Sequence, residues 1–426
     1  MASSQAKVIV LDDDPTGSQT VHSCLLLLRW DVETLIQGLR DPAPLFFILA
    51  NTRALTPEAA QAITQEVCQN LKVAIAEVEL TDFVVVSRSD STLRGHYPLE
   101  TDVIAAELGP FDAHFLVPAF FEGGRITRGS VHYVVQPDGT ELAAHQTEFA
   151  RDSVFGYHHS YLPDYVAEKT QGLISAATVE RLLLEDLREP TNNLTGRLQE
   201  FTNNQCAVVD GETQTDLDLF AQSLQEAAAS GKKFLFRSAA SLLTSLAQLG
   251  PQPVAATKMS QYRRNSNPGV VLVGSHVQKT TRQLAVLLEQ PGVLPIEVDV
   301  ARLRDHPDSS PQLKQEILAQ VASAFTQQQT PVIFTSREEL TFADIDTRLA
   351  FGADVSRLLM SVVTDLPADI SYLLSKGGIT SNDVLSQGLR LRTARLLGQI
   401  LPGVSLVQTP ETCDRFPGLP VVLFPG

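Results

Sequence analysis

The stretch Phe83-Val84-Val85-Val86-Ser87-Arg88-Ser89-Asp90-Ser91-Thr92-Leu93-Arg94-Gly95-His96 decides how the fold of this chain is interpreted. Its four apolar residues, three of them β-branched, predict a short buried strand. The residues that follow carry hydroxyls, a carboxylate and two guanidinium groups. Open parallel sheets present their ligand-binding loops at the carboxyl ends of the strands, so this order of residues predicts a binding loop.

The polar side chains of this stretch suit a small anionic polyol. Arg88 and Arg94 can clamp a carboxylate or a phosphate through paired N–H donors. Asp90, Ser91 and Thr92 can hydrogen-bond the hydroxyl groups of the polyol. The alternative is a solvated loop with incidental charges, because polar loops are common.

The composition is that of a folded protein with more than one domain: 426 residues, of which 43% are hydrophobic and 19% charged. A formal net charge of −16 argues against nucleic-acid binding, because an acidic surface repels a phosphate backbone. The sequence contains no run that is long and apolar enough to cross a bilayer, and residues 1–7 are too short and polar for a signal peptide. The four cysteines lack metal-ligand spacing. We therefore expect a cytoplasmic protein without a membrane partner.

Short apolar runs alternate with helical patterns along most of the chain, which is the signature of a parallel sheet covered on both faces. The first predicted strands are 8–11, 45–49, 83–86 and 114–117. Thr56-Pro57-Glu58 predicts a helix start, with a hydroxyl N-cap and proline at the first helical position. Segment 120–170 breaks the alternation and predicts a functional insertion, with a hairpin around Pro137-Asp138-Gly139.

A polar stretch rich in proline and glycine divides the chain. We predict a first domain at 1–250, a linker at 251–268 and a second domain at 269–426. In the second domain the predicted strands are 270–273, 296–300, 332–334, 372–374 and 421–424. The predicted fold class is α/β and two-lobed, with each lobe a mainly parallel sheet flanked by helices.

Three consecutive acids end the first predicted strand, in Val8-Ile9-Val10-Leu11-Asp12-Asp13-Asp14-Pro15-Thr16-Gly17. They cannot all be buried and ionised without a partner, because repulsion and desolvation would raise their pKa values. A metal ion, a sugar hydroxyl or a basic group is therefore expected close by. The structural alternative is an acidic N-cap cluster on a following helix.

One enzyme class that fits this segment is the haloacid-dehalogenase type of phosphatase. Asp12 would then accept the phosphoryl group and Asp14 would act as general acid and base. That fold also needs a late pair of acids that hold magnesium, and the sequence around Gly352-Ala353-Asp354 lacks the second acid.

A second interpretation uses all the motifs together. Asp13-Asp14-Pro15-Thr16-Gly17, Asn51-Thr52-Arg53, Asp90-Ser91-Thr92-Leu93-Arg94-Gly95 and Lys376-Gly377-Gly378-Ile379-Thr380-Ser381 occur in that order. So arranged, they resemble the four-carbon acid sugar kinases, which phosphorylate threonate, erythronate or 3-oxo-tetronate with ATP. The resemblance runs from Val8 to Gly426. It implies a first lobe that binds the sugar acid and a second lobe that binds ATP with Mg²⁺.

The resemblance assigns roles to residues of the first lobe. The implied catalytic residues are Asp13, Asp14 and Asp90. The implied substrate-binding residues are Arg53, Ser89, Asp90, Ser91, Thr92 and Arg94. For Arg53 the alternative is a surface arginine whose stem covers the next helix.

In the second lobe, glycines at two predicted strand ends would let backbone amides approach phosphates at helix starts. We expect Thr380 and Ser381 to cap the second of these helices. The implied nucleotide-binding residues are Gly274, Ser275, Lys376, Gly377, Gly378, Ile379, Thr380 and Gly426. No metal ligands are assigned. The sequence has no Gly-x-x-x-x-Gly-Lys-Ser/Thr string, so an ordinary P-loop is not expected.

Three expectations remain open at this point. Members of the family that the motifs resemble continue past a Phe-Pro-Gly like that at 424–426 into a short Asn-x-Gly loop that touches the nucleotide, whereas this sequence stops at Gly426, so full nucleotide binding is left open. A non-catalytic sugar-acid-binding relative is the third functional alternative. The partners expected are the small sugar acid and ATP, and a homodimer is compatible with the sequence.

Overall fold

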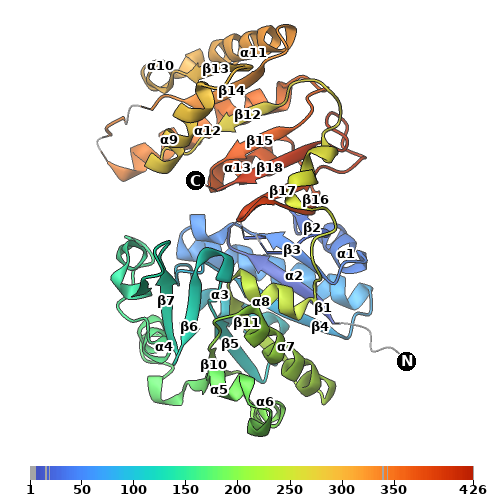
Figure 1. Cartoon of the computed structure of the whole chain (residues 1–426), viewed down its shortest axis with the longest axis vertical. Helices are drawn as coiled ribbons and strands as arrows, with labels where there is room; N and C mark the ends of the chain where they lie inside the picture. Colours follow the sequence, from blue (N-terminus) through green and yellow to red (C-terminus); the bar gives the residue numbers. More distant parts are fainter. Residues whose placement is uncertain (1–5, 15–16, 19, 338–339, 343, 426) are drawn as a thin grey trace. The chain divides into compact units, whose positions relative to one another are not determined.

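The computed structural model describes residues 6–14, 17–18, 20–337, 340–342 and 344–425. The chain divides into two compact units, the first ending at Gln252 and the second beginning at Pro253. Figure 1 shows the elements of both units in chain order. The α/β class with mainly parallel sheets is confirmed.

Unit 1 is built on a parallel sheet whose strand order is β2-β3-β1-β4-β11-β5-β10-β9. Its strands are β1 (Lys7–Asp12), β2 (Cys24–Leu27), β3 (Leu45–Leu49), β4 (Phe83–Arg88), β5 (Ala113–Val117), β9 (Glu180–Leu182), β10 (Gln205–Val209) and β11 (Phe234–Ser238). The central strands are completely or almost completely buried, as apolar runs without alternation predict. β4 runs two residues further than predicted, so Ser87 and Arg88 belong to the strand and not to the loop.

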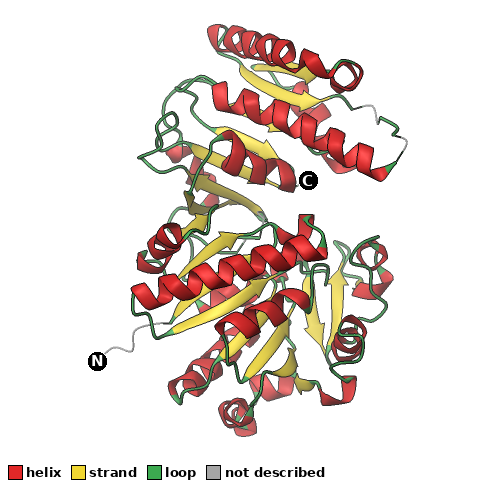
Figure 2. Ribbon diagram, turned by 180° about the vertical axis from the view of Figure 1, so that it is seen from behind, coloured by secondary structure: helices red, strands yellow, loops and turns green. Residues whose placement is uncertain are grey.

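Helices cover both faces of this sheet. They are α1 (Val32–Arg40), α2 (Pro57–Glu77), α3 (Leu99–Leu108), α5 (Leu184–Arg188), α6 (Leu194–Glu200), α7 (Gln214–Ala229) and α8 (Ala240–Leu246). Figure 2 shows the long helix α2 across one face. It begins as predicted, because the Thr56 hydroxyl accepts a hydrogen bond from the Ala59 N–H and Pro57 occupies the first turn. Its buried stripe packs with α1 and α3 onto the sheet.

The insertion at 120–170 forms a small antiparallel sheet beside the main sheet of unit 1 (Figure 1). It contains β6 (Arg125–Arg128), β7 (Val131–Val135), β8 (Glu141–Ala143) and helix α4 (Leu162–Lys169). β7 and β8 form the predicted hairpin, with Pro137-Asp138-Gly139 in the turn. Tyrosines of the insertion pack against the chain that follows β4, so the insertion supports that loop.

Unit 2 has the strand order β13-β14-β12-β15-β18-β17-β16, in which β16, β17 and β18 pair antiparallel and the others parallel. Its strands are β12 (Val270–Val273), β13 (Val293–Val298), β14 (Thr330–Thr335), β15 (Leu373–Lys376), β16 (Thr393–Leu401), β17 (Val404–Gln408) and β18 (Pro420–Phe424). Its helices are α9 (Gln278–Leu288), α10 (Val300–Asp305), α11 (Ser310–Thr326), α12 (Ile345–Asp365) and α13 (Gly378–Asp383).

One predicted boundary in unit 2 is wrong. The strand expected at 296–300 ends at Val298, because the Asp299 carboxylate accepts a hydrogen bond from the Arg302 N–H (2.9 Å) and starts helix α10. Residues 251–268 contain a 3-10 helix, Ala256–Tyr262. Within the described ranges, no helix has the length and apolar character needed to cross a membrane.

Candidate functional site

The carboxyl ends of four neighbouring strands in unit 1 bring the predicted polar residues together. Strands β3, β1, β4 and β11 lie side by side and parallel, with Asp12 of β1 in register with Leu49 of β3 and Arg88 of β4. The loops that leave these strands therefore meet at one edge of the sheet. This edge carries the carboxylates, guanidinium groups and hydroxyls that the sequence singled out.

Arg53 is the centre of this cluster. Its guanidinium forms an ion pair with Asp14, and it lies 3.8 Å from Asp13 Oδ1 and 3.5 Å from Asp90 Oδ1. The Arg53 N–H also donates to the Asp13 carbonyl (3.3 Å), so backbone and side chain join two strand ends. Arg53 is thus not the surface arginine of the alternative interpretation.

Asp12 is fully buried beneath the cluster. Its Oδ1 accepts from Arg88 Nη1 at 3.3 Å and from the Asp14 N–H at 3.2 Å. Burial raises its pKa to about 7, against the lowering influence of Arg88. The Cα of Gly17 lies so close that an added Cβ would be 2.2 Å from Asp12 Oδ2. This enclosure argues against Asp12 as the phosphoryl acceptor of a phosphatase.

Asp13 is also buried, and it makes looser contacts. Arg53 and Arg88 lie 3.8 and 3.7 Å from its Oδ1, and neither of its carboxylate oxygens has a hydrogen-bond partner among the described residues. Burial raises its pKa, and the Glu100 carboxylate adds to this while Arg53 opposes it. Both oxygens of this acid can therefore accept hydrogen bonds that the hydroxyl groups of a polyol would donate.

Asp90 has the opposite electrostatics. Burial opposes its ionisation, but Arg53 and Arg94 outweigh that effect and lower its pKa to about 2. Arg94 Nε donates to Asp90 Oδ2 at 2.8 Å, and the Thr92 hydroxyl bonds the same oxygen. Asp90 is therefore ionised at neutral pH. It can accept hydrogen bonds, but it is not suited to take up a proton.

The loop around Asp90 is held by the insertion. His132, Tyr157 and Tyr165 donate to the carbonyls of Ser91, Thr92 and Leu93 at 2.8, 2.8 and 2.7 Å. Ser89 is buried, and its N–H donates to the Ser238 carbonyl. A loop with these supports is not the solvated loop of the alternative interpretation.

Two arginines near this edge were not predicted as site residues. Arg237, at the end of β11, is buried and donates to Ser87 Oγ (2.7 Å) and to Glu100. The sequence contained a signal for Arg237, since this charged residue directly follows the apolar run 234–236. The rule that binding residues follow the strands of a parallel sheet could have found it. Arg125, on β6, belongs to the predicted insertion. The sequence of the insertion did not indicate that Arg125 would lie near the Asp90 loop.

In unit 2, the ends of β12 and β15 are adjacent, and the glycines there pack against Thr380. An added Cβ on Gly274 would lie 2.2 Å from Thr380 Oγ1, and one on Gly377, whose φ is +120°, would lie 3.1 Å from the same atom. The expected capping is wrong: Gly377 is the N-cap of α13 without a side-chain cap, and Thr380 and Ser381 lie within the helix.

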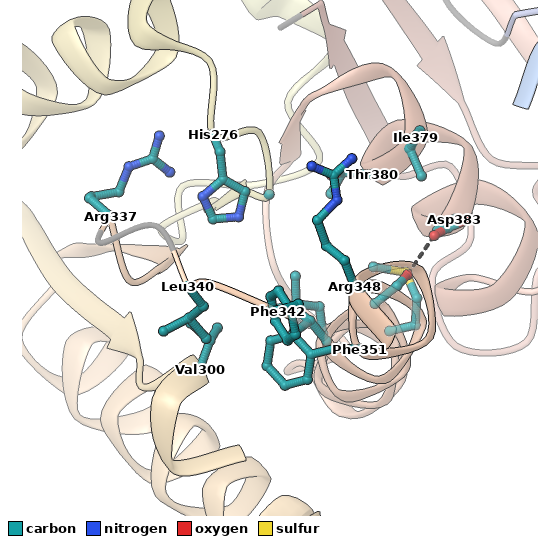
Figure 3. A pocket seen from close by; sticks show the side chains of 16 residues that line it. His276, Val300, Arg337, Leu340, Phe342, Arg348, Phe351, Ile379, Thr380 and Asp383 are labelled. Carbon is teal, nitrogen blue, oxygen red and sulfur yellow. Dashed lines mark hydrogen bonds between the residues drawn. The ribbon is translucent and has the colours of Figure 1, made fainter. Parts of the chain in front are cut away.

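A cavity of about 510 Å³ adjoins these glycines (Figure 3). Of the predicted nucleotide-binding residues, Gly274, Ile379 and Thr380 line it, whereas Ser275, Lys376, Gly377 and Gly378 do not. Predicted residues Gly426, Pro15 and Thr16 lie outside the described residues. The remaining lining combines apolar side chains and two arginines with His276, Ser356 and Asp383; the apolar and cationic ones include Val300, Arg337, Phe342, Arg348 and Phe351.

Lys376 contacts the chain end rather than this cavity. Its Nζ donates to the Pro425 carbonyl at 2.7 Å and lies 4.1 Å from the centre of the Phe424 ring. Burial lowers its pKa to about 8, with a contribution from Lys279. The part of the chain that the structure describes has no cluster of three or more His, Cys, Asp or Glu residues that could hold a metal ion.

The fold and the two sites together define a class of protein: a two-unit α/β protein with an acid- and arginine-lined site in one unit and an apolar, cationic cavity in the other. Residues 8–246 match the sugar-binding N-terminal domain family, and residues 270–426 match the nucleotide-binding C-terminal domain family. The chain belongs to the four-carbon acid sugar kinase family, as its motifs predicted.

Comparisons with individual proteins agree with this assignment. A D-erythronate kinase from Heliobacterium modesticaldum is 28% identical over 228 residues, which cover 51% of this chain and 47% of that protein. The matched region thus spans about half the length of this curated relative. Two solved structures share the fold. A Salmonella typhimurium LT2 protein has a TM-score of 0.71 at 20% identity and 99% and 96% coverage of the two chains. A Haemophilus influenzae protein has a TM-score of 0.64 at 17% identity, and the match covers 98% of this chain and 96% of that protein.

Proposed function

We propose that this chain is an ATP-dependent kinase that transfers a phosphoryl group to a hydroxyl of a four-carbon sugar acid. The observation that carries the proposal is the contact of Arg53 with Asp13, Asp14 and Asp90 at one sheet edge. A small polyol with a carboxylate needs acids for its hydroxyls and a guanidinium for its charge. Membership of the sugar acid kinase family supports the same substrate class.

The three acids of this cluster are suited to different tasks. Asp90, with a pKa of about 2, would accept hydrogen bonds from substrate hydroxyls without taking a proton. Asp13 is buried and would orient Arg53 and the substrate. The side chain of Asp14 is 20% exposed, so it is the acid that an incoming hydroxyl can reach. We therefore assign Asp14 as the general base that receives the hydroxyl proton during transfer.

The nucleotide would bind in the cavity of unit 2. Phe342 and Phe351 lie 5.3 Å apart between ring centres and offer an apolar surface for a base. Arg348 and Arg337 also line the cavity (Figure 3) and supply cationic groups for phosphates. Since the described residues lack a metal cage, we expect Mg²⁺ to arrive on the phosphates of ATP, where it neutralises their charge.

A substrate screen tests this function. Purified protein is mixed with Mg-ATP and, separately, D-erythronate, L-erythronate, D-threonate, L-threonate or their 3-oxo forms, and ADP formation is followed by a coupled assay. We expect ADP formation above the acid-free rate with at least one acid, and loss of that increment in Asp14→Asn. Turnover that is the same with and without every acid would contradict the proposal.

A further inference from the structure

The arginines at the unit 1 site differ in how their charges are compensated. Four of them form ion pairs with carboxylates of the chain: Arg53, Arg88, Arg94 and Arg237. Arg125 is the exception, because no carboxylate within the described ranges lies at ion-pair distance from its guanidinium. The cation of Arg125 is therefore left for a ligand.

The position of Arg125 is fixed by local contacts. One of its Nη atoms donates to the Gly123 carbonyl, while its Nε is buried and has no hydrogen-bond partner in the described part of the chain. Its guanidinium lies 5.8 Å from the centre of the Phe149 ring, and that of Arg94 lies 5.1 Å from the same ring. Two guanidinium groups thus gather around one aromatic side chain.

Of this pair of cations, Arg94 is balanced by Asp90 and by Asp152, whose Oδ2 lies 3.6 Å from Arg94 Nη1, so the charge without a paired carboxylate is that of Arg125. Asp90 acts on Arg125 from beyond contact distance, and its carboxylate is already bound by Arg53 and Arg94. Glu148 is exposed and also acts from a distance. The neighbouring His132 is buried, and its pKa falls to about 4 through burial and the positive charge of Arg125, so it stays neutral and adds no cation. One carboxylate of a ligand would complete the group.

There is room for a ligand beside Arg125. A cavity of about 570 Å³ is lined by Arg125 together with Phe149, Thr147, Glu148, Glu122 and residues 134–135 of β7. The Asp90 loop, where the polyol hydroxyls are expected, is tied to the same guanidinium pair, because Arg94 Nε donates to Asp90 Oδ2 at 2.8 Å and the Asp90 carboxylate also acts on Arg125. A carboxylate bound by Arg125 would therefore belong to the same polar group as the hydroxyls bound at the loop.

We propose that Arg125, assisted by Arg94, binds the carboxylate of the sugar acid and so makes this site select acids over neutral sugar alcohols. The inference rests on the proposed function and adds to it a residue that determines specificity. The inference also gives Arg53 a different task. Because its charge is already balanced by Asp14, Arg53 holds the acids in place around the substrate hydroxyls.

The test compares an acid with the alcohol that lacks only its carboxylate. Dissociation constants of D-erythronate, D-threonate, erythritol and threitol are measured by calorimetry for wild type, Arg125→Gln and Arg125→Lys. Arg128→Gln is the matched control, because Arg128 is on the same strand but pairs with Glu141 and Glu212 at the surface. Circular dichroism and melting temperature verify that each variant is folded.

We expect Arg125→Gln to weaken the binding of the preferred acid by roughly 10- to 100-fold, since a hydrogen-bonded charge pair is lost. Alcohol binding should change little, Arg125→Lys should recover part of the preference for acid, and Arg128→Gln should behave as wild type. An unchanged acid-to-alcohol ratio in folded Arg125→Gln overturns this inference and leaves the proposed function in place. If wild type binds none of the acids of the substrate screen, both fail.

Discussion

Asp12 should make the stability of this protein depend on pH in an unusual direction. Its carboxylate is fully buried, and its pKa is raised from 3.8 to about 7. A carboxyl group whose pKa is higher in the folded state stabilises the fold at low pH, and this contribution is lost as the pH rises through the folded value. Above pH 7, ionised Asp12 therefore costs about 4 kcal/mol, since one pKa unit corresponds to about 1.36 kcal/mol.

The substitution Asp12→Asn removes the ionisation and keeps the shape and an oxygen for Arg88. From the same two pKa values, the stability of Asp12→Asn relative to wild type should rise by roughly 2–3 kcal/mol between pH 5 and pH 8. For a unit of this size, that corresponds to several degrees in melting temperature. The substitution also removes a negative charge beside Asp13, so Asp13 ionises more easily. This too raises the stability of Asp12→Asn relative to wild type as the pH rises.

Scanning fluorimetry of both proteins at pH 5, 6, 7 and 8 measures the difference. Asp216→Asn is the control, because Arg188 and Thr213 hold the pKa of Asp216 at about 2, despite its burial. Its stability contribution is present above the unfolded pKa, so its difference from wild type should be flat over this pH range. Parallel melting profiles of Asp12→Asn and wild type would refute the description of Asp12 as a buried, protonatable acid.

Three further substitutions test separate parts of the account. Asp14→Asn should lower kcat by about 10²- to 10⁴-fold and leave the dissociation constant of ATP within twofold, because a general base is lost; equal losses in both would make Asp14 a structural residue. Arg348→Gln should raise KM for ATP while calorimetry shows unchanged sugar-acid binding, whereas Arg357→Gln, on the same helix but not in the cavity lining, should change neither. Gly17→Ala should lower the melting temperature, because its Cβ would overlap both Asp12 oxygens; an unchanged melting profile would show that the backbone there yields freely.

Much of unit 1 could be predicted from local sequence. Apolar runs that end in charged residues give both the parallel strands and the edge at which their loops meet. Asp13, Arg53 and Asp90 are brought together by this rule alone, as their contacts show. The boundary of β13 was missed because Asp299, which caps the next helix, lies in the alternating stretch Ile296-Glu297-Val298-Asp299-Val300, whose pattern is that of a strand.

What the sequence could not give is the pairing of charges across distant elements. On the sequence alone, Arg94 is predicted as a substrate-binding residue, whereas Arg125, in the insertion, is given no role. Only the structure shows that Arg94 is held by Asp90 and that Arg125 has no such partner among the described residues. The apolar wall of the unit 2 cavity escaped prediction for a similar reason, because Phe342 and Phe351 come from a loop and a helix without a recognisable motif.

The central claim is that phosphorus passes from ATP to a sugar-acid hydroxyl. Mass spectrometry of the acid recovered after incubation with protein and Mg-ATP tests it most directly. The account predicts a four-carbon acid heavier by one phosphoryl group, in an amount equal to the ADP formed and absent with Asp14→Asn. Recovery of every tested acid unmodified, with ATP intact or hydrolysed to free phosphate, would contradict it.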